Sequence, residues 1–345
     1  MPLELTKSSN TILEVENLKT YFFTKAATVK AVDGVTFSLA AGETFGLVGE
    51  SGSGKSQTLR SILRLISPPG KIIGGSIRYR GKELLKVPLG DMRGYRGSEI
   101  GMIFQEPMTA LNPVLRIREQ IFESLENKGL TTDQKNARAV ELLRLVGVPS
   151  PERRIEEYAH QFSGGMRQRA MIAITLAAEP KILLADEPTT ALDVTIQDQI
   201  LKLIVGLKDR LGMSVIMVTH DLGIVAQMCD RVAVMYAGRI VEITDTLTLF
   251  GAPRHPYTLG LMGSLPHGAR GSRLQPITGQ PPNLANLPAG CPFAPRCRFA
   301  EPLCTEVYPE MVQVGSGHFS RCHFTDKLDG QSGIIDLGNV AEGRR

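Results

Sequence analysis

The sequence predicts an α/β fold with a mixed or parallel sheet at its core. Two uniformly apolar runs, at 182–185 and 215–218, are separated by a helical stretch from about 194 to 210. Runs that are apolar on both faces and alternate with helices are typical of a buried parallel sheet. Residues 11–48 instead alternate apolar and polar positions around turn-prone breaks. This second pattern predicts short antiparallel strands ahead of the parallel core.

A glycine-rich segment follows the apolar, strand-like run 45–48 and fits the pattern G-x-x-x-x-G-K-[ST] at each position: Gly49-Glu50-Ser51-Gly52-Ser53-Gly54-Lys55-Ser56. Glycines let a backbone curl until successive N–H groups face phosphate oxygens. Lys55 adds a positive charge for the β- and γ-phosphates, and Ser56 offers a hydroxyl to Mg²⁺. The next segment, from Gln57, is apolar at helical spacing, so the loop opens onto a helix N-terminus that favours anions. An accidental glycine-rich turn is the alternative, and the flanking strand and helix favour nucleotide binding.

The rest of the chain predicts further elements. Residues 66–98 suggest another strand and loop, and the pattern becomes helical between about 110 and 160. Thr132 or Asp133 is expected to cap a helix there that ends at Gly147. After about residue 250, proline and glycine become frequent. This composition predicts a loop-rich tail held by something other than a broad core.

Length and composition limit the possible functions. The 345 residues favour one large domain with an appendage, or two domains. A net charge of +4 is too mild to indicate nucleic acid binding and is compatible with an anionic membrane surface. The sequence contains neither an apolar run long enough to span a bilayer nor a signal-peptide pattern at its start. We therefore expect a cytosolic chain that takes part in membrane functions through a partner.

Two further segments carry chemistry. Asp186 and Glu187 end the first apolar run, where Asp186 can hold the Mg²⁺ water shell and Glu187 can deprotonate an attacking water. Two solvated acids at a strand end are the alternative interpretation. At 161–169, Ser163, Gly164 and Gly165 open a long apolar helix. Their hydroxyl and N–H groups form a second candidate anion site.

Together these segments resemble the ATP-binding subunit of an ABC transporter, in which the 161–169 signature reaches the γ-phosphate of nucleotide held by the other subunit. Phe162 and Met166 replace the commoner leucine and glutamine, and neither change removes a phosphate-contacting group. The resemblance implies that Gln105 is the glutamine that senses Mg²⁺ and attacking water beside the membrane-subunit contact. It implies that Asp193 lies across a dimer interface and that His220 contacts the γ-phosphate. A histidine at a strand end is usually structural, so the role of His220 depends on this resemblance.

The implied fold is a P-loop NTPase of the ABC type, with an antiparallel β subdomain and a helical subdomain. The aromatic residue that stacks on adenine is expected near Tyr21 and Phe22, and Phe22 is preferred. The implied catalytic residues are Glu187, His220 and Gln105, and the implied Mg²⁺ site uses Ser56, Gln105 and Asp186. The expected nucleotide contacts are Phe22, Gly49, Glu50, Ser51, Gly52, Ser53, Gly54, Lys55, Ser56, Gln57, Gln105, Ser163, Gly164, Gly165, Gln168, Asp186 and Asp193.

Three longer stretches, 105–113, 185–195 and 255–258, resemble the dipeptide/oligopeptide permease group of importers. This resemblance implies an ATP-hydrolysing motor, at the cytoplasmic face of the inner membrane, for import of dipeptides or oligopeptides. The implied partners are two polytopic permease subunits, a second ATPase and an extracytoplasmic substrate-binding protein. A heterodimer is favoured over a homodimer. Nickel or oligosaccharide import, and a soluble ABC ATPase acting on ribosomes or DNA, are the alternatives.

Four of the five cysteines gather near the end of the chain, at Cys291, Cys297, Cys304 and Cys322. Such a cluster in a reducing compartment indicates metal or cluster ligation before disulfides. By resemblance, some permease ATPases bind a [4Fe–4S] cluster in this region, and four thiolates suffice for one. Zinc with His318 or His323 as substitute ligands, and free buried thiols, are the alternatives. Cys229 is expected to be a small core residue.

The expected domains follow from these assignments. The ATPase domain covers 11–250, with its helical subdomain at about 106–178. A permease-type extension with the four cysteines covers 251–330. Residues 1–10 and 331–345 are expected to be tails.

Overall fold

The computed structural model of the chain describes residues 10–190, 192–264, 277–328 and 330. These residues form two compact units, one made of those within 1–86 and 217–345 and the other of those within 87–216. Ala191, the segment 265–276 and most of the two expected tails lie outside the described residues. In the described ranges, no helix is both long enough and apolar enough to cross a bilayer.

An antiparallel sheet opens the first unit. Its strands are β1 (Thr11–Phe23), β2 (Thr28–Ala40), β4 (Gly70–Tyr79) and β5 (Lys82–Glu83), in the order β2-β1-β4-β5. The alternating pattern of 11–48 therefore predicted the antiparallel strands β1 and β2 correctly, although both are longer than expected. The segment 66–98, where one strand and a loop were expected, contains β4 and the two-residue β5. A register shift after Val15 moves the buried positions of β1 from Leu13 and Val15 to Leu18 and Thr20. Asn17 at this shift has a φ of 47°, which displaces the alternation by one residue.

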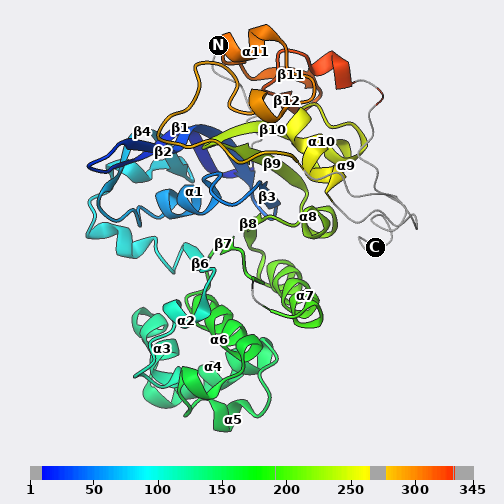
Figure 1. Ribbon diagram of the computed structural model, residues 1–345. Coiled ribbons are helices and arrows are strands. Elements are labelled where there is room, and N and C mark those ends of the chain that lie inside the picture. The colour runs from blue at the N-terminus through cyan, green and yellow to red at the C-terminus, as the bar shows by residue number, and fades with distance from the viewer. Residues whose placement is uncertain (1–9, 191, 265–276, 329, 331–345) are drawn as a thin grey trace. The chain divides into compact units, whose positions relative to one another are not determined.

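A second set of strands carries the phosphate loop. β3 (Thr44–Val48) runs parallel to β9 (Arg231–Tyr236), and β9 pairs antiparallel with β10 (Arg239–Asp245). From the C-terminal region, β12 (His318–Ser320) pairs with β10, and β11 (Val312–Gly315) pairs with β12. Figure 1 shows β11 and β12 beside β10. The loop-rich tail is thus attached to this unit by backbone pairing.

Short helices complete the first unit. The α-helices are α1 (Lys55–Ile62), α8 (Leu222–Met228), α9 (Thr246–Gly251), α10 (Pro256–Gly263) and α11 (Pro302–Glu306). Single 3₁₀ turns lie at η1 (Leu84–Lys86), η5 (Ala294–Arg296) and η6 (Thr325–Leu328). The buried hydroxyls of Thr20 and Ser61 lie 2.7 Å apart and connect β1 to α1. Cys229 follows the end of α8, is fully buried, and lies against Gly46 of β3, as expected for a core residue.

The second unit is mainly helical (Figure 1). Its parallel strands β6 (Ile100–Ile103) and β7 (Ile182–Asp186) are fully buried. The other elements are η2 (Asp91–Gly94), α2 (Pro107–Ala110), α3 (Ile117–Ser124), η3 (Glu126–Lys128), α4 (Thr132–Leu145), α5 (Pro151–Arg154), η4 (Ala159–Gln161), α6 (Gly164–Ala177) and α7 (Val194–Leu211). β8 (Ser214–Thr219) leads along the chain into the first unit. The apolar runs therefore predicted β7 and β8 correctly.

The expected cap of α4 was wrong by one residue. Thr131 is the N-cap, and its hydroxyl accepts a hydrogen bond from the backbone N–H of Gln134 at 3.3 Å. The side chain of Gln134 in turn accepts from the N–H of Thr131 at 2.9 Å. This reciprocal capping box satisfies two N–H groups, which a cap at Thr132 or Asp133 would leave to solvent.

Candidate active site

The phosphate loop depends on glycine for packing as well as for phosphate access. Gly49 has a φ of 152° and Gly54 a φ of 104°. A Cβ on Gly49 would lie 2.2 Å from the carbonyl oxygen of Met235, and one on Gly54 would lie 2.2 Å from that of Ala31. Both glycines therefore let the loop pass directly against neighbouring backbone. The sequence motif indicated the glycines but not this second reason for them.

Lys55 closes the loop on itself. Its Nζ donates to the carbonyl oxygens of Gly49 at 2.7 Å and Glu50 at 3.0 Å, and the residue is only 4% exposed. Ser56 and Gln57 follow it in the first turn of α1, whose N-cap is Gly54. The lysine charge and the helix N-terminus thus lie together, which is the arrangement that favours a phosphate anion.

Phe22 and Tyr21 face different surroundings on β1. The Tyr21 hydroxyl donates to Asp33 Oδ1 at 2.6 Å. Burial is the main cause that raises the pKa of Tyr21 to about 12, and the bond to Asp33 adds to it. The Phe22 ring instead packs against Gly70, where a Cβ would come within 2.6 Å of Phe22 Cε1. Tyr21 is thus engaged by Asp33, and the role of Phe22 in stacking on adenine stays a prediction.

The register of β6 and β7 brings Gln105 to Glu187. Ile103 pairs with Ala185 in the parallel ladder, so the residues two positions further along lie opposite each other. Gln105 Nε2 donates to Glu187 Oε2 at 3.2 Å, and Thr190 Oγ1 donates to the same oxygen at 2.9 Å. Glu187 also has a φ of 45°, a conformation that costs free energy in a residue with a Cβ. Such strain is common where a side chain must be aimed at a reacting group.

Asp186 occupies the last position of β7 and is 1% exposed. The strand therefore presents one buried carboxylate and one partly exposed carboxylate in succession. His220 directly follows β8 and is exposed, and Asp221 after it caps α8 by accepting from the N–H of Gly223 at 2.7 Å. Asp186 and His220 thus both lie at strand ends, as the sequence predicted.

The signature segment lines a hollow of about 360 Å³. Ser163 is the N-cap of α6, and its Oγ accepts from the N–H of Met166 at 3.3 Å. Asp193 caps α7 in the same way, accepting from the N–H of Ile196 at 2.9 Å. The complete lining is Ser163, Gly164, Gly165, Met166, Arg169, Leu192, Asp193 and Ile196. Two helix N-termini therefore bound one hollow with both polar and apolar walls, and helix N-termini favour anions.

Gln168 lies elsewhere. It is 2% exposed within α6, is not part of that lining, and its Nε2 is buried without a hydrogen-bond partner.

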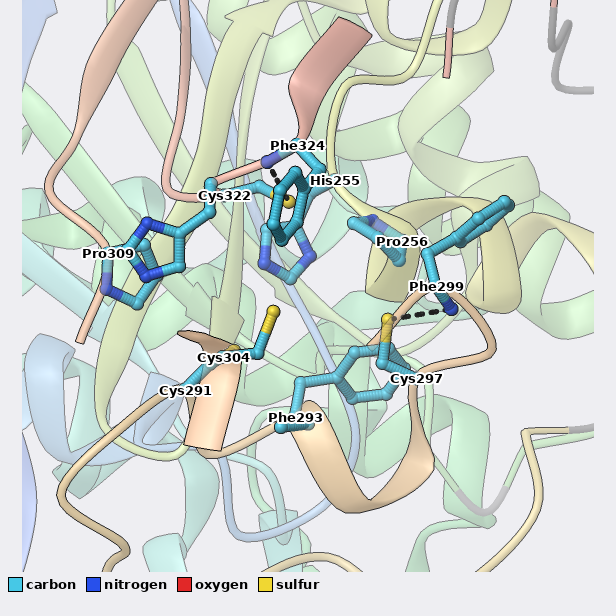
Figure 2. Close-up of a pocket in the computed structure, with 12 residues that line it drawn as sticks. His255, Pro256, Cys291, Phe293, Cys297, Phe299, Cys304, Pro309, Cys322 and Phe324 are labelled. Atoms are coloured by element: carbon cyan, nitrogen blue, oxygen red, sulfur yellow. Dashed lines mark hydrogen bonds between the residues drawn. The ribbon is translucent and has the colours of Figure 1, made fainter. Parts of the chain in front are cut away.

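The four clustered cysteines line one pocket. Figure 2 shows Cys291, Cys297, Cys304 and Cys322 around it, with His255 and several aromatic rings. Burial raises the pKa of the Cys291 and Cys322 thiols to about 11. In the part of the chain that the structure describes, no group of three or more Cys, His, Asp or Glu side chains is arranged to hold a single metal ion.

Of the two histidines expected near these cysteines, His323 lines this pocket and His318 does not. His323 lines it, and its Nε2 is 2.9 Å from the carbonyl oxygen of Val307. His318 is not part of the lining and lies 2.8 Å from Glu242 in the core. The sequence analysis missed His255, which burial keeps neutral by lowering its pKa to about 3.

Two residues at the phosphate loop were also missed. Tyr257 accepts a hydrogen bond from the N–H of Glu50 at 2.7 Å, and Arg296 forms an ion pair with the Glu50 carboxylate at 2.7 Å. Tyr257 belongs to the segment 255–258, which the sequence indicated only by its resemblance to the permease group and not as a contact of the phosphate loop. Nothing in the sequence singled out Arg296.

Comparisons with known proteins agree with this geometry. The family model of the ABC transporter matches residues 32–190, and that of the oligopeptide/dipeptide transporter C-terminal region matches residues 241–304. The probable peptide ABC transporter ATP-binding protein y4tR of Sinorhizobium fredii is 48% identical over 93% of this chain and 97% of its own. The dipeptide transport ATP-binding protein DppD of Bacillus subtilis is 49% identical over 92% of this chain and 95% of its own.

Solved structures give the same answer for the fold. The dimeric ATP-binding cassette MJ0796, bound to ADP and phosphate after hydrolysis, aligns with a TM-score of 0.62 at 26% identity. The alignment covers 68% of this chain and 99% of that one. With the phosphate loop, the paired carboxylates and the signature helix in place, the chain belongs to the ATP-hydrolysing, ATP-binding proteins of ABC transporters, in the group that carries the oligopeptide/dipeptide transporter C-terminal region.

Proposed function

We propose that the chain is the motor subunit of an importer for dipeptides or oligopeptides. The observation that carries this proposal is the match of residues 241–304 to the oligopeptide/dipeptide transporter C-terminal region, on a chain that also has a phosphate loop. The high identity to a dipeptide transport ATP-binding protein over almost the whole chain supports it further. On this proposal, residues 11–250 form the ATPase domain and 251–330 the permease-type extension.

The proposed mechanism assigns a task to each part of the site. The loop from Gly49 to Ser56 holds the phosphates, and Phe22 stacks on adenine. Ser56, Gln105 and Asp186 are the residues that would hold Mg²⁺, whose chemistry is to neutralise the phosphate charge. Glu187, held by Gln105 and Thr190, takes the proton of the attacking water. The remaining proposed contacts are His220, Ser163, Gly164, Gly165 and Asp193, whereas Gln168 is buried within α6 and is left out of the proposed contacts.

Pairing is part of the proposal. None of the phosphate-loop residues belongs to the lining of the signature hollow bounded by Ser163 and Asp193. A two-fold or pseudo-two-fold pair would give each nucleotide a loop from one subunit and a signature from the other. We propose a second, related ATPase as the partner, with a homodimer as the alternative, two permease subunits, and a substrate-binding protein outside the membrane. The chain would then work as a peripheral protein at the cytoplasmic face of the inner membrane.

The test of the mechanism is Glu187→Gln in the full-length chain with its membrane subunits. Loss of the base should lower ATP turnover by at least a hundredfold while ATP still binds. Glu141→Gln, at a surface position on α4, is the matched control and should turn over normally. Near-normal hydrolysis by Glu187→Gln would remove this residue from the mechanism.

The test of the cargo is uptake. Cells with and without the chain are given labelled dipeptide, oligopeptide, nickel or oligosaccharide in parallel. Peptide uptake that depends on the chain supports the proposal, and uptake of only nickel or sugar overturns it. Co-purification of ribosomal proteins or DNA instead of permease subunits would favour the soluble alternative.

We also propose that the four cysteines bind a [4Fe–4S] cluster. Four sulfur donors line one pocket with apolar walls, which fits the donor set of such a cluster. A four-iron cluster is much larger than one ion, so its thiolates stand farther apart than those around zinc. When bound, the cluster would supply a covalent link among Cys291, Cys297, Cys304 and Cys322.

Metal content distinguishes these assignments. Anaerobically purified protein should contain about four iron and four sulfide per chain. Cys304→Ser should lose them, and Cys229→Ala, outside the pocket, should keep them. One zinc per chain, or no metal at all, would overturn the cluster in favour of zinc or of free thiols.

A further inference from the structure

Glu50 is the second residue of the phosphate loop, and its carboxylate is held from the C-terminal region. Arg296 Nη1 donates to Glu50 Oε2 at 2.7 Å, and Arg296 Nη2 donates to Oε1 at 2.8 Å. The two residues are 246 positions apart in the sequence. The Arg296 side chain is 4% exposed and that of Glu50 is 27% exposed. A shielded, bidentate pair of this kind is among the stronger polar contacts in proteins.

The guanidinium is fixed by other contacts as well. Its Nε donates to the carbonyl oxygen of Thr278 at 3.0 Å, and Nη1 also donates to the Tyr236 hydroxyl at 3.2 Å. The bond to Glu50 is the main cause that raises the pKa of Arg296. Arg296 is therefore held in one orientation by three neighbours and presents its charge to Glu50.

The backbone of Glu50 is held independently of its side chain. Its N–H donates to the Tyr257 hydroxyl at 2.7 Å, and Tyr257 is fully buried. Both the main chain and the side chain of one phosphate-loop residue are thus positioned by residues downstream of 250. Gly49 directly before it has a φ of 152°, and Gly52 two positions after it has a φ of 77°, conformations that few residues other than glycine adopt.

The same two segments line the four-cysteine pocket. His255 and Pro256, directly before Tyr257, belong to its lining, and so do Ala294 and Cys297 around Arg296. Phe293 lines it too, and its ring centroid is 5.3 Å from those of Tyr257 and Tyr236. The segments around Tyr257 and Arg296 therefore contribute both to the lining of the cysteine pocket and to the contacts with Glu50.

The charge of Glu50 gives this arrangement a consequence for binding. A carboxylate in a loop that receives a polyphosphate repels it unless a cation neutralises that carboxylate. Arg296 is the cation in bidentate contact with Glu50. We infer that Arg296 and Tyr257 are positioning residues of the nucleotide site, through which the C-terminal region sets the affinity of the phosphate loop for polyphosphate.

The experiment measures equilibrium binding of Mg-ATP, Mg-ADP and adenosine to the full-length chain. Arg296→Gln leaves Glu50 without its guanidinium, so affinity for Mg-ATP and Mg-ADP should fall about tenfold, and affinity for adenosine should stay unchanged. Glu50→Gln removes the repelling charge, so the double variant Glu50→Gln/Arg296→Gln should bind Mg-ATP more tightly than Arg296→Gln alone. Arg298→Gln, two positions away and exposed, is the matched control and should bind normally.

The double variant separates positioning from a fold defect. Damage to the fold would weaken adenosine binding too, and Glu50→Gln would not repair it. Arg296→Lys keeps the charge and loses the bidentate geometry, and it serves as a second variant if Arg296→Gln does not fold. Its affinity for Mg-ATP should lie between that of the original chain and the about tenfold lower value expected for Arg296→Gln. Unchanged Mg-ATP binding in both Arg296 variants, or a double variant as weak as Arg296→Gln alone, would overturn the inference.

Discussion

The side-chain amide of Gln105 donates to the Glu187 carboxylate across 3.2 Å, from the end of one parallel strand to the end of its neighbour. Thr190 donates to the same carboxylate oxygen from the turn after β7. Glu187 is thus held by two donors while its backbone adopts a costly conformation. The orientation of the carboxylate follows from these neighbours, and this can be tested at Thr190.

We expect Thr190→Val to lower kcat for ATP about tenfold and to leave KM unchanged. Valine keeps the shape of threonine and removes the hydroxyl, and a hydrogen bond to a charged group contributes about 1.5–3 kcal/mol. Steady-state hydrolysis by the full-length chain measures both constants, with Thr132→Val on α4 as the control at an exposed threonine. A kcat equal to that of the control would show that the Thr190 hydroxyl does not orient the base.

A second prediction concerns the adenine contact. Phe22→Ala should weaken Mg-ATP binding about tenfold, because stacking of a base on an aromatic ring contributes about 1–3 kcal/mol. Binding of inorganic triphosphate should stay the same, since it has no base. Phe23→Ala is the control, because Phe23 is the next aromatic residue and is 45% exposed. Equal losses for triphosphate and ATP would show that Phe22 supports the fold of β1 instead.

The sequence predicted well what local pattern determines. The phosphate loop, the strand ends at Asp186 and His220, and the helix after Ser163 all lie where their motifs indicated. The expected cap at Thr132 or Asp133 and the expected shortness of the first strands were wrong, because a cap shifted by one residue, or a strand that continues through a register shift, leaves almost the same sequence pattern.

Long-range pairing could not be predicted in this way. Arg296 is one arginine among many, and only the folded chain brings it to Glu50. His255 lies in the cysteine pocket because it caps α10, which packs there. His318 lies outside the pocket because its ring contacts Glu242 in the core. These contacts depend on tertiary structure, which spacing along the chain does not record.

A third prediction follows from the segments that both line the cysteine pocket and contact Glu50. The double variant Cys291→Ser/Cys297→Ser should weaken Mg-ADP binding several-fold and leave adenosine binding unchanged, because both cysteines lie within six residues of Arg296. The measurement is the same equilibrium titration, with Cys229→Ala as the control for loss of a buried thiol elsewhere. Normal Mg-ADP binding in the double variant would mean that the cysteine pocket and the phosphate loop act independently.

The last prediction concerns pH. Burial raises the pKa of Cys291 and Cys322 to about 11 in the folded chain, above the usual value of 9.0 for the unfolded one. The folded, metal-free protein therefore holds these protons more tightly than the unfolded chain does. The stabilisation is fully present below pH 9 and is lost as the pH rises towards 11. Two pKa units correspond to about 2–3 kcal/mol for each thiol.

Denaturant unfolding of the metal-free chain between pH 8 and pH 11 measures this loss. Cys291→Ser/Cys322→Ser is the reference, because serine does not ionise in this range and every other titrating group is shared. Above pH 9 the free energy of unfolding should fall more steeply for the original chain than for the variant. Below pH 9 the free energies of unfolding of the two proteins should change with pH in the same way. Equal slopes over the whole range would show that the two thiols are hydrated in the folded protein. Because metal ligation requires thiolates, the same raised pKa values predict that loading the pocket releases protons and becomes less favourable as the pH falls.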